Sequence, residues 1–134
     1  MEDCIFCKIA KGEIPSAKIW EDDNFLSFLD INPVTEGVAL VIPKEHKDSA
    51  IFENDQETIN EIMAASKKVS ELLKKTLDIE RIGVIFEGIE VDHLHIKLIP
   101  IKEGEFIKSI LNSSYQKPDK TELENLASRV RTSK

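Results

Sequence analysis

Short runs of alternating or continuous apolar residues predict β-strands in the first third of the chain. Residues 18–21 and 25–29 flank a turn signal at Asp22-Asp23-Asn24, which predicts a hairpin. Gly37 then precedes residues 38–42, which are apolar throughout, as expected for a strand covered on both faces. Pro43 ends this run, so the chain is expected to begin with three strands.

A longer stretch with helical periodicity follows. Asn54 and Glu57 match a capping box, and apolar or small side chains recur after them at spacings of three and four. These side chains belong to Ile59, Ile62, Met63, Ser66, Val69 and Leu73. The pattern predicts a helix from about residue 55 to residue 77.

The last third of the chain predicts two more strands and a short helix. The strands are residues 81–86 and 91–99, and Thr121 with Glu124 predicts the cap of the helix. The apolar positions of this helix are Leu123, Leu126, Ala127 and Val130. The order of elements predicts an α+β fold: a five-stranded antiparallel meander sheet with one long helix on one face and a short C-terminal helix. We expect a single domain over 1–134, with its core at about 4–102 and a helical tail at about 105–134.

Composition narrows the class of protein. Of 134 residues, 41% are hydrophobic and 32% are charged, which excludes a fibrous or wholly disordered chain. The formal net charge is −7, which disfavours general binding to nucleic acid. No apolar run approaches the roughly 20 residues that span a bilayer, and the first residues lack a signal-peptide pattern. We therefore expect a cytoplasmic protein with no membrane and no nucleic-acid partner.

The three histidines lie in or beside two of the predicted strands. Residues two apart in a strand share a face, so His93, His95 and Lys97 are expected to line one face of strand 91–99. The opposite face carries the apolar residues Leu94, Ile96 and Leu98. A hydrogen-bonded pair of histidines at a sheet edge would account for two of the three. If this strand neighbours the one that precedes His46, all three imidazoles are expected to converge.

Cys4 and Cys7 form a Cys-x-x-Cys motif, which is compatible with a redox pair, a metal half-site or two small buried residues. A thioredoxin-like redox motif starts a helix after a strand, whereas this motif precedes every predicted strand. Structural zinc takes four sulfur and nitrogen ligands in a tetrahedron. His46 and one of His93 and His95 would complete such a set, because neighbouring histidines on one strand face lie too far apart for both to bind undistorted.

These motifs, in this order, resemble those of the histidine triad family. Residues 93–100 read His-Leu-His-Ile-Lys-Leu-Ile-Pro and resemble the family's signature of alternating histidines. Further matching segments are 4–9, 12–15, 28–33 and 37–46, so the likeness covers about residues 4–102, and the final helix is also family-like. The resemblance implies a homodimer in which two five-stranded sheets join. It also implies binding of purine nucleotides, with hydrolysis or transfer at the α-phosphorus.

The resemblance also implies roles for individual residues. His95 matches the family's nucleophile. In the zinc-bearing branches the metal is held by the residues that match Cys4, Cys7, His46 and His93. We expect zinc in a structural role and no organic cofactor.

Residues that match substrate contacts are spread along the chain. Asp30, which from its position alone either caps a turn or binds ribose hydroxyls, matches the family's ribose-binding acid. Phe6, Phe28 and Ile31 match positions that flank the base. Gly88 matches a glycine of the loop that contacts phosphate.

Two positions depart from the family pattern. Lys97 replaces the third histidine, and the loop 85–90 keeps Gly88 but lacks the family's asparagine and Gly-Gln amides. On the face of His95, Lys97 would offer a positive charge to the phosphate oxygens.

The predicted function is hydrolysis of purine nucleoside phosphoramidates or dinucleoside polyphosphates. It would proceed through a nucleotidyl intermediate on His95 and release a nucleoside monophosphate. One alternative is a zinc-stabilised nucleotide-binding or sensor protein with little or no turnover. Another is a thiol redox protein that uses Cys4 and Cys7.

Overall fold

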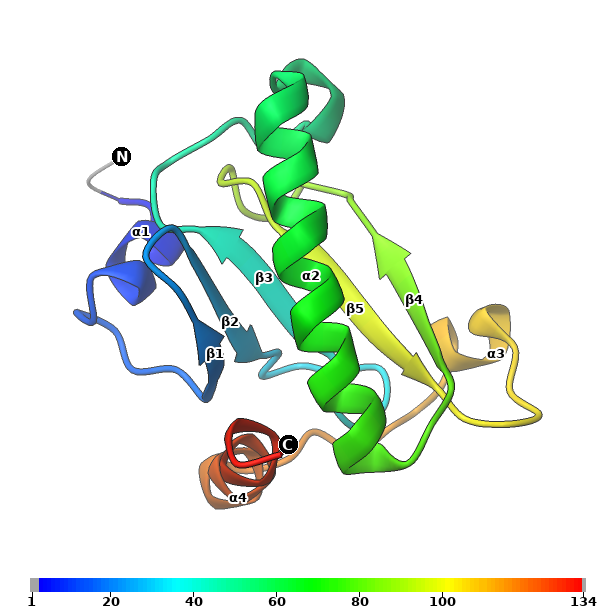
Figure 1. Ribbon diagram of the computed structural model, residues 1–134. Helices are drawn as coiled ribbons and strands as arrows, with labels where there is room; N and C mark the ends of the chain where they lie inside the picture. Colours follow the sequence, from blue (N-terminus) through cyan, green and yellow to red (C-terminus); the bar gives the residue numbers. More distant parts are fainter. Residues whose placement is uncertain (1–2, 134) are drawn as a thin grey trace.

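The computed structural model describes residues 3–133, and Figure 1 shows a sheet crossed on one face by a long helix. Within these residues the five strands are β1 (Lys18–Glu21), β2 (Phe25–Leu29), β3 (Ala39–Pro43), β4 (Arg81–Ile85) and β5 (Ile96–Ile101). The helices are α1 (Ile5–Ala10), the 3-10 helix η1 (Ile51–Glu53), α2 (Gln56–Leu77), α3 (Ile107–Leu111) and α4 (Lys120–Arg131). The predicted α+β fold class is confirmed.

The strand order differs from a simple meander at the last two strands. The order is β1-β2-β3-β5-β4, and every neighbouring pair is antiparallel. β3 and β4 therefore run in the same direction, and parallel strands need a long crossover connection. The 22-residue helix α2 supplies this connection across one face (Figure 1), and β5 returns between the two strands.

The two faces of the sheet bury different sets of side chains. On the face covered by α2, the side chains of β5 and of the residues just before it pack against the long helix; they include Leu94, Ile96 and Leu98, as predicted. On the opposite face, Phe28 and Leu40 pack against Phe6 of α1. Every residue of β3 is buried, which confirms the interpretation of its apolar run.

The predicted cap of α2 is wrong by one residue. Asp55 is the N-cap, and its carboxylate accepts a hydrogen bond of 2.8 Å from the backbone N–H of Thr58. The Asn54 side chain instead donates to the carbonyl oxygens of Asp48 and Ala50. Those bonds hold Asn54 outside the helix, so the next residue takes the capping position.

The predicted cap of α4 is wrong by two residues. Asp119 and Glu122 form a reciprocal capping box, in place of Thr121 and Glu124. The predicted apolar face is present, because Leu123, Ala127 and Val130 are buried in the main core. Arg131 donates to the carbonyl oxygen of Lys18 at 2.6 Å, so α4 lies beside β1.

The last strand begins five residues later than predicted. Val41 pairs with Ile96, and continuation of this register would bring Pro43 opposite Leu94. Proline has no backbone N–H to donate, so the ladder ends there. The backbone N–H of Leu94 donates instead to the carbonyl oxygen of Lys47 at 2.9 Å. Residues 91–95 therefore run beside the segment after β3 without forming a strand with it.

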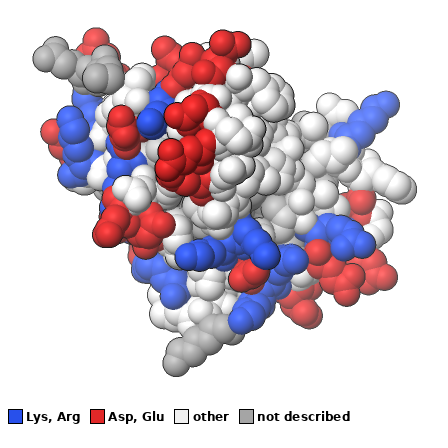
Figure 2. All heavy atoms as spheres, turned by 45° about the horizontal axis from the view of Figure 1, so that its top comes forward, with Lys and Arg blue, Asp and Glu red and all other residues white. Residues whose placement is uncertain are grey.

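Charged side chains of both signs lie on the surface. No helix of residues 3–133 combines the length and apolar character needed to cross a membrane. Figure 2 shows acidic side chains lying between basic ones on the face that this view presents.

Candidate functional site

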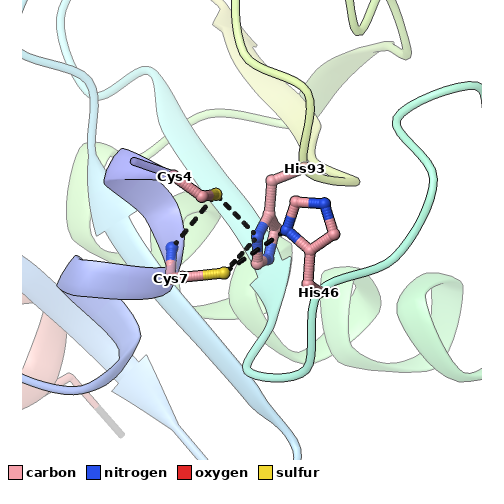
Figure 3. Close-up of side chains that lie close together, drawn as sticks. All are labelled: Cys4, Cys7, His46 and His93. Atoms are coloured by element: carbon pink, nitrogen blue, oxygen red, sulfur yellow. Dashed lines mark hydrogen bonds between the residues drawn. The ribbon is translucent and has the colours of Figure 1, made fainter. Parts of the chain in front are cut away.

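Four sulfur and nitrogen atoms meet where α1 packs against the loop after β3 and the segment before β5 (Figure 3). Cys4 caps α1, and its sulfur accepts from the backbone N–H of Cys7, which places both thiols on one side of the helix. Nδ1 of His93 lies 3.3 Å from Sγ of Cys4 and 3.4 Å from Sγ of Cys7. Nδ1 of His46 lies 3.3 Å from Sγ of Cys7. The predicted neighbourhood of β3 and β5 thus brings His46 and His93 together.

This arrangement fits a four-coordinate metal ion. Zinc binds sulfur at about 2.3 Å and nitrogen at about 2.0–2.1 Å in a tetrahedron, which places sulfur and nitrogen ligands about 3.5 Å apart. The sulfur–nitrogen distances here are 3.3–3.4 Å, and all four ligand atoms lie within 4.8 Å of one another. Cys4, Cys7, His46 and His93 can therefore bind a metal ion together.

The surroundings of His93 favour this role. Nε2 of its ring donates a hydrogen bond of 2.8 Å to the carbonyl oxygen of Pro43, since a carbonyl oxygen only accepts. The lone pair of a neutral ring is then on Nδ1, which faces the two sulfurs. Burial lowers the pKa of His93, which favours the neutral form. Burial also raises the pKa of the Cys7 thiol, with a further contribution from Cys4, so metal binding would have to displace a proton there.

His95 lies outside the metal-ligand set. Its Nδ1–H donates to the carbonyl oxygen of His93 at 2.8 Å, which leaves the lone pair of a neutral ring on Nε2. Within residues 3–133 no hydrogen bond reaches Nε2. The ring of Phe6 meets the His95 ring edge-on at 5.2 Å between centroids and limits its rotation. His95 is only 9% exposed, and it lines a cavity of about 110 Å³.

This cavity, on the sheet face opposite α2, has a mixed lining, with apolar residues from the sheet and several charged groups. Its polar lining residues are Asp30, Asn32, Glu87, Glu90, His95 and Lys97. Nζ of Lys97 lies 3.4 Å from Oδ2 of Asp30. Oδ1 of Asp30 accepts from the backbone N–H of Asn32 at 2.9 Å, so Asp30 caps a turn and also faces the cavity. The strand-face pattern predicted that Lys97 lies on the side of His95, and this is confirmed.

The other predicted substrate contacts lie outside this cavity. Phe6 and Phe28 are buried and pack edge-to-face at 5.6 Å, beneath His95 and His93. Ile31 is 58% exposed and lines a separate hollow beside α4. Gly88 has φ of +72°, and a Cβ there would lie 2.5 Å from the carbonyl oxygen of Ser49. Glycine is thus needed for the close approach of two loops.

Two charged lining residues of the cavity, Glu87 and Glu90, are not among the site residues that the sequence predicts. Both belong to the loop 85–90, which the sequence marks only by its lack of amides. The available signal was charge, because two carboxylates stand in a segment where contacts to phosphate were expected.

Comparison with known proteins agrees with this architecture. A family model described as the HIT domain matches residues 11–104. A HIT-like protein of Borreliella burgdorferi is 45% identical over 108 residues, which cover 75% of this chain and 76% of that protein. An adenosine 5′-monophosphoramidase of Schizosaccharomyces pombe is 40% identical over 108 residues, which cover 77% of each chain.

The fold also has a parallel among solved structures. A Zn-bound histidine triad family protein from Mycobacterium smegmatis superposes with a TM-score of 0.78 at 29% identity, covering 97% of this chain and 91% of that one. Together with the domain match over most of the chain, this similarity identifies the protein as a member of the histidine triad (HIT) family.

Proposed function

We propose that this protein hydrolyses purine nucleoside phosphoramidates or dinucleoside polyphosphates at the α-phosphorus, with His95 as the nucleophile. The observation that best supports the proposal is the hydrogen bonding of the His95 ring. Its Nδ1–H is held by the His93 carbonyl oxygen, and Nε2 has no protein partner within residues 3–133. A neutral imidazole held in this way is a competent nucleophile near neutral pH. The family membership and the name of the fission yeast relative support a hydrolase role.

The proposed reaction has two steps. Nε2 of His95 attacks the α-phosphorus, and the bond to the leaving nitrogen or phosphate oxygen breaks with its electron pair. A leaving amine takes up a proton as it departs, which gives a neutral or cationic amine and a nucleotidyl-histidine. Water then attacks the same phosphorus, and the P–N bond to His95 breaks. The products are a nucleoside monophosphate and free enzyme.

Two charged residues are proposed to orient the substrate. Asp30 would accept hydrogen bonds from ribose hydroxyls through its oxygens at the cavity wall. Lys97 would place its ammonium group between Asp30 and the phosphate oxygens, where charge develops during transfer. A lysine acts there as a compact cation, whereas the histidine of the family signature can also donate a proton.

We also propose one structural zinc ion per chain, held by Cys4, Cys7, His46 and His93. When bound, the ion supplies a cross-link between α1 and the segment that carries His95. The ligand residues themselves position the site, because His93 contributes its ring to the ligand set and its carbonyl oxygen to His95.

A homodimer is part of the proposal. β4 lies at one edge of the sheet and exposes Val84, whereas the β1 edge packs beside α4. Unpaired strand edges are ready to pair with a second chain. We therefore expect β4 of two protomers to join the sheets.

The second candidate is a nucleotide-binding protein with little turnover. It is favoured by the ion pair between Lys97 and Asp30, because this pair neutralises the positive charge that the proposed transfer to His95 needs. Incubation with adenosine 5′-phosphoramidate, followed by intact mass measurement and product analysis, separates the two candidates. A hydrolase forms AMP and a transient adenylylated species, and His95→Ala abolishes both. A protein that binds the nucleotide but forms neither product refutes the hydrolase proposal.

A further inference from the structure

The cavity beside His95 contains more negative charge than a site for phosphate needs. Asp30, Glu87 and Glu90 contribute three carboxylates to its lining, against the single ammonium group of Lys97. Lys97 is already paired with Asp30 at 3.4 Å. Within residues 3–133 no lysine or arginine forms an ion pair with Glu87 or Glu90. Both side chains are exposed and free to meet a ligand.

The carboxylates stand on two sides of Lys97. Phe28 pairs with Leu40, Leu40 with Lys97, and Lys97 with Ile85, so these residues form a row across four strands. Asp30 follows Phe28 by two residues, and Glu87 follows Ile85 by two residues. Because β2 and β4 run in opposite directions, the two carboxylates lie on opposite sides of this row. Lys97 lies in the row, and His95, two residues before it, lies on the side of Glu87.

A bound substrate would therefore meet different groups at its two ends. If Asp30 receives the ribose, the nucleoside occupies the β2 side, and the α-phosphorus lies beside His95. Glu87 and Glu90 are then left to face the part of the substrate that departs. His95 also indicates that a ligand binds here, because it lines the same cavity, is only 9% exposed, and has no hydrogen bond to Nε2 within residues 3–133.

We propose that Glu87 and Glu90 form a subsite for a positively charged leaving group. This inference rests on the proposed function and narrows its substrate class to nucleoside phosphoramidates whose amine carries a second, non-reacting ammonium group. Opposite charges in this subsite favour such a group, whereas the phosphates of a dinucleoside polyphosphate are repelled by two carboxylates. The second ammonium group keeps its proton throughout, so the two reaction steps are unchanged.

The test compares two matched substrates with the full-length protein. Each is adenosine 5′-phosphoramidate, substituted on nitrogen either by a 3-aminopropyl group, which carries an ammonium, or by a neutral butyl group of similar length. The measured quantity is the ratio of the two kcat/KM values at about 10 mM ionic strength, where screening is weak. Exposed ion pairs are worth about threefold each, so two carboxylates predict a ratio of about ten.

Variants identify the residues responsible. In Glu87→Gln/Glu90→Gln the ratio falls to about two or less, because the amides keep the size of the side chains and remove their charge. Glu71→Gln makes the same chemical change on an exposed position of α2, on the other side of the sheet, and keeps the ratio of ten. Diadenosine tetraphosphate serves as the anionic substrate. Its kcat/KM is lower than that of the aminopropyl substrate and rises in the double variant.

The outcomes test the cation subsite separately from the proposed hydrolysis. A ratio near one for the unchanged protein, or a ratio that the double variant leaves at ten, overturns the cation subsite while hydrolysis itself stands. Faster cleavage of diadenosine tetraphosphate than of the aminopropyl substrate also overturns it. If the unchanged protein cleaves none of the three substrates, the proposed function fails, and the subsite fails with it.

Discussion

Replacement of Lys97 by alanine tests the most distinctive side chain of the proposed active site. Nζ of Lys97 lies 3.4 Å from Oδ2 of Asp30, and the lysine side chain is 35% exposed, compared with 13% for the aspartate. Removal of the ammonium group therefore has two consequences. The phosphate loses a nearby cation, and the Asp30 carboxylate is left as an unneutralised negative charge in the same cavity.

The expected kinetic effect is large compared with the stability effect. A partly exposed ion pair of this kind contributes about 0.5 kcal/mol to folding after solvent screening, so Lys97→Ala should fold normally. Loss of one group that stabilises charge on a transferring group costs about 10²-fold in rate, or about 2.7 kcal/mol. We expect kcat/KM to fall about 10²-fold, and Lys97→His to recover the activity or exceed it.

The assay is steady-state hydrolysis of an adenosine phosphoramidate, with circular dichroism to verify folding. Asp30→Asn serves as the reference for the double variant Asp30→Asn/Lys97→Ala, because the asparagine also weakens the proposed ribose contact. If Lys97 contacts phosphate, adding Lys97→Ala to Asp30→Asn slows the reaction by about a further 10²-fold. If Lys97 only neutralises Asp30, adding it changes the rate little. A change within about twofold for Lys97→Ala, or about 0.4 kcal/mol, would refute any role of the lysine in catalysis.

Four further predictions follow from the same structure. Protein prepared without chelators should contain about one zinc per chain by elemental analysis. Cys7→Ser should lose the zinc, and its Tm should fall by roughly 5–10 °C, in line with a loss of about 2 kcal/mol in the free energy of unfolding. Absence of zinc from the unchanged protein, or an unchanged Tm in Cys7→Ser, contradicts this. His95→Ala should remove nearly all hydrolysis but bind AMP within about threefold of the unchanged protein by calorimetry, because the nucleophile acts mainly on the chemical step. Lys18 and Lys44 hold the pKa of Glu21 below its usual range, so as pH falls the unfolded chain binds a proton at Glu21 before the folded protein does. Glu21→Gln should therefore lower the free energy of unfolding by about 0.5 kcal/mol at pH 7, as measured by urea unfolding. This difference between the variant and the unchanged protein should vanish below the lowered pKa of Glu21. Light scattering at micromolar concentration should give the mass of two chains, and a mass near 15.2 kDa would count against the β4 interface.

The fold was predictable wherever a local pattern decides the structure. The apolar run of β3, the helical spacing of α2 and the alternation from Leu94 to Leu98 each report burial that the structure contains. The strand order was not predictable in the same way. β5 lies between β3 and β4, and this depends on where α2 ends relative to β3 rather than on a local pattern. The start of β5 depends on a partner strand as well, since Pro43 ends the ladder from across the sheet.

The candidate site shows the same division. The metal-ligand set could be assembled from residue types and from a resemblance, because few side chains suit zinc and the chain has only two cysteines and three histidines. The position of Glu87 and Glu90 in the cavity could not be predicted, because it depends on a contact between loops that are distant in the sequence. Gly88 makes that contact by approaching the Ser49 carbonyl oxygen, which no local pattern reveals.

His93 contributes to two parts of the site through two different groups. Its ring faces the cysteines, while the tautomer of His95 depends on its backbone carbonyl oxygen, which every amino acid has. The side chain at position 93 can therefore change without removing the hydrogen bond that His95 donates from Nδ1. A His93→Cys chain would carry three sulfurs in the proposed ligand set, and Nε2 of its His95 would still be the proposed nucleophile. A substitution at this position would thus alter the affinity for metal more than the proposed chemistry at phosphorus.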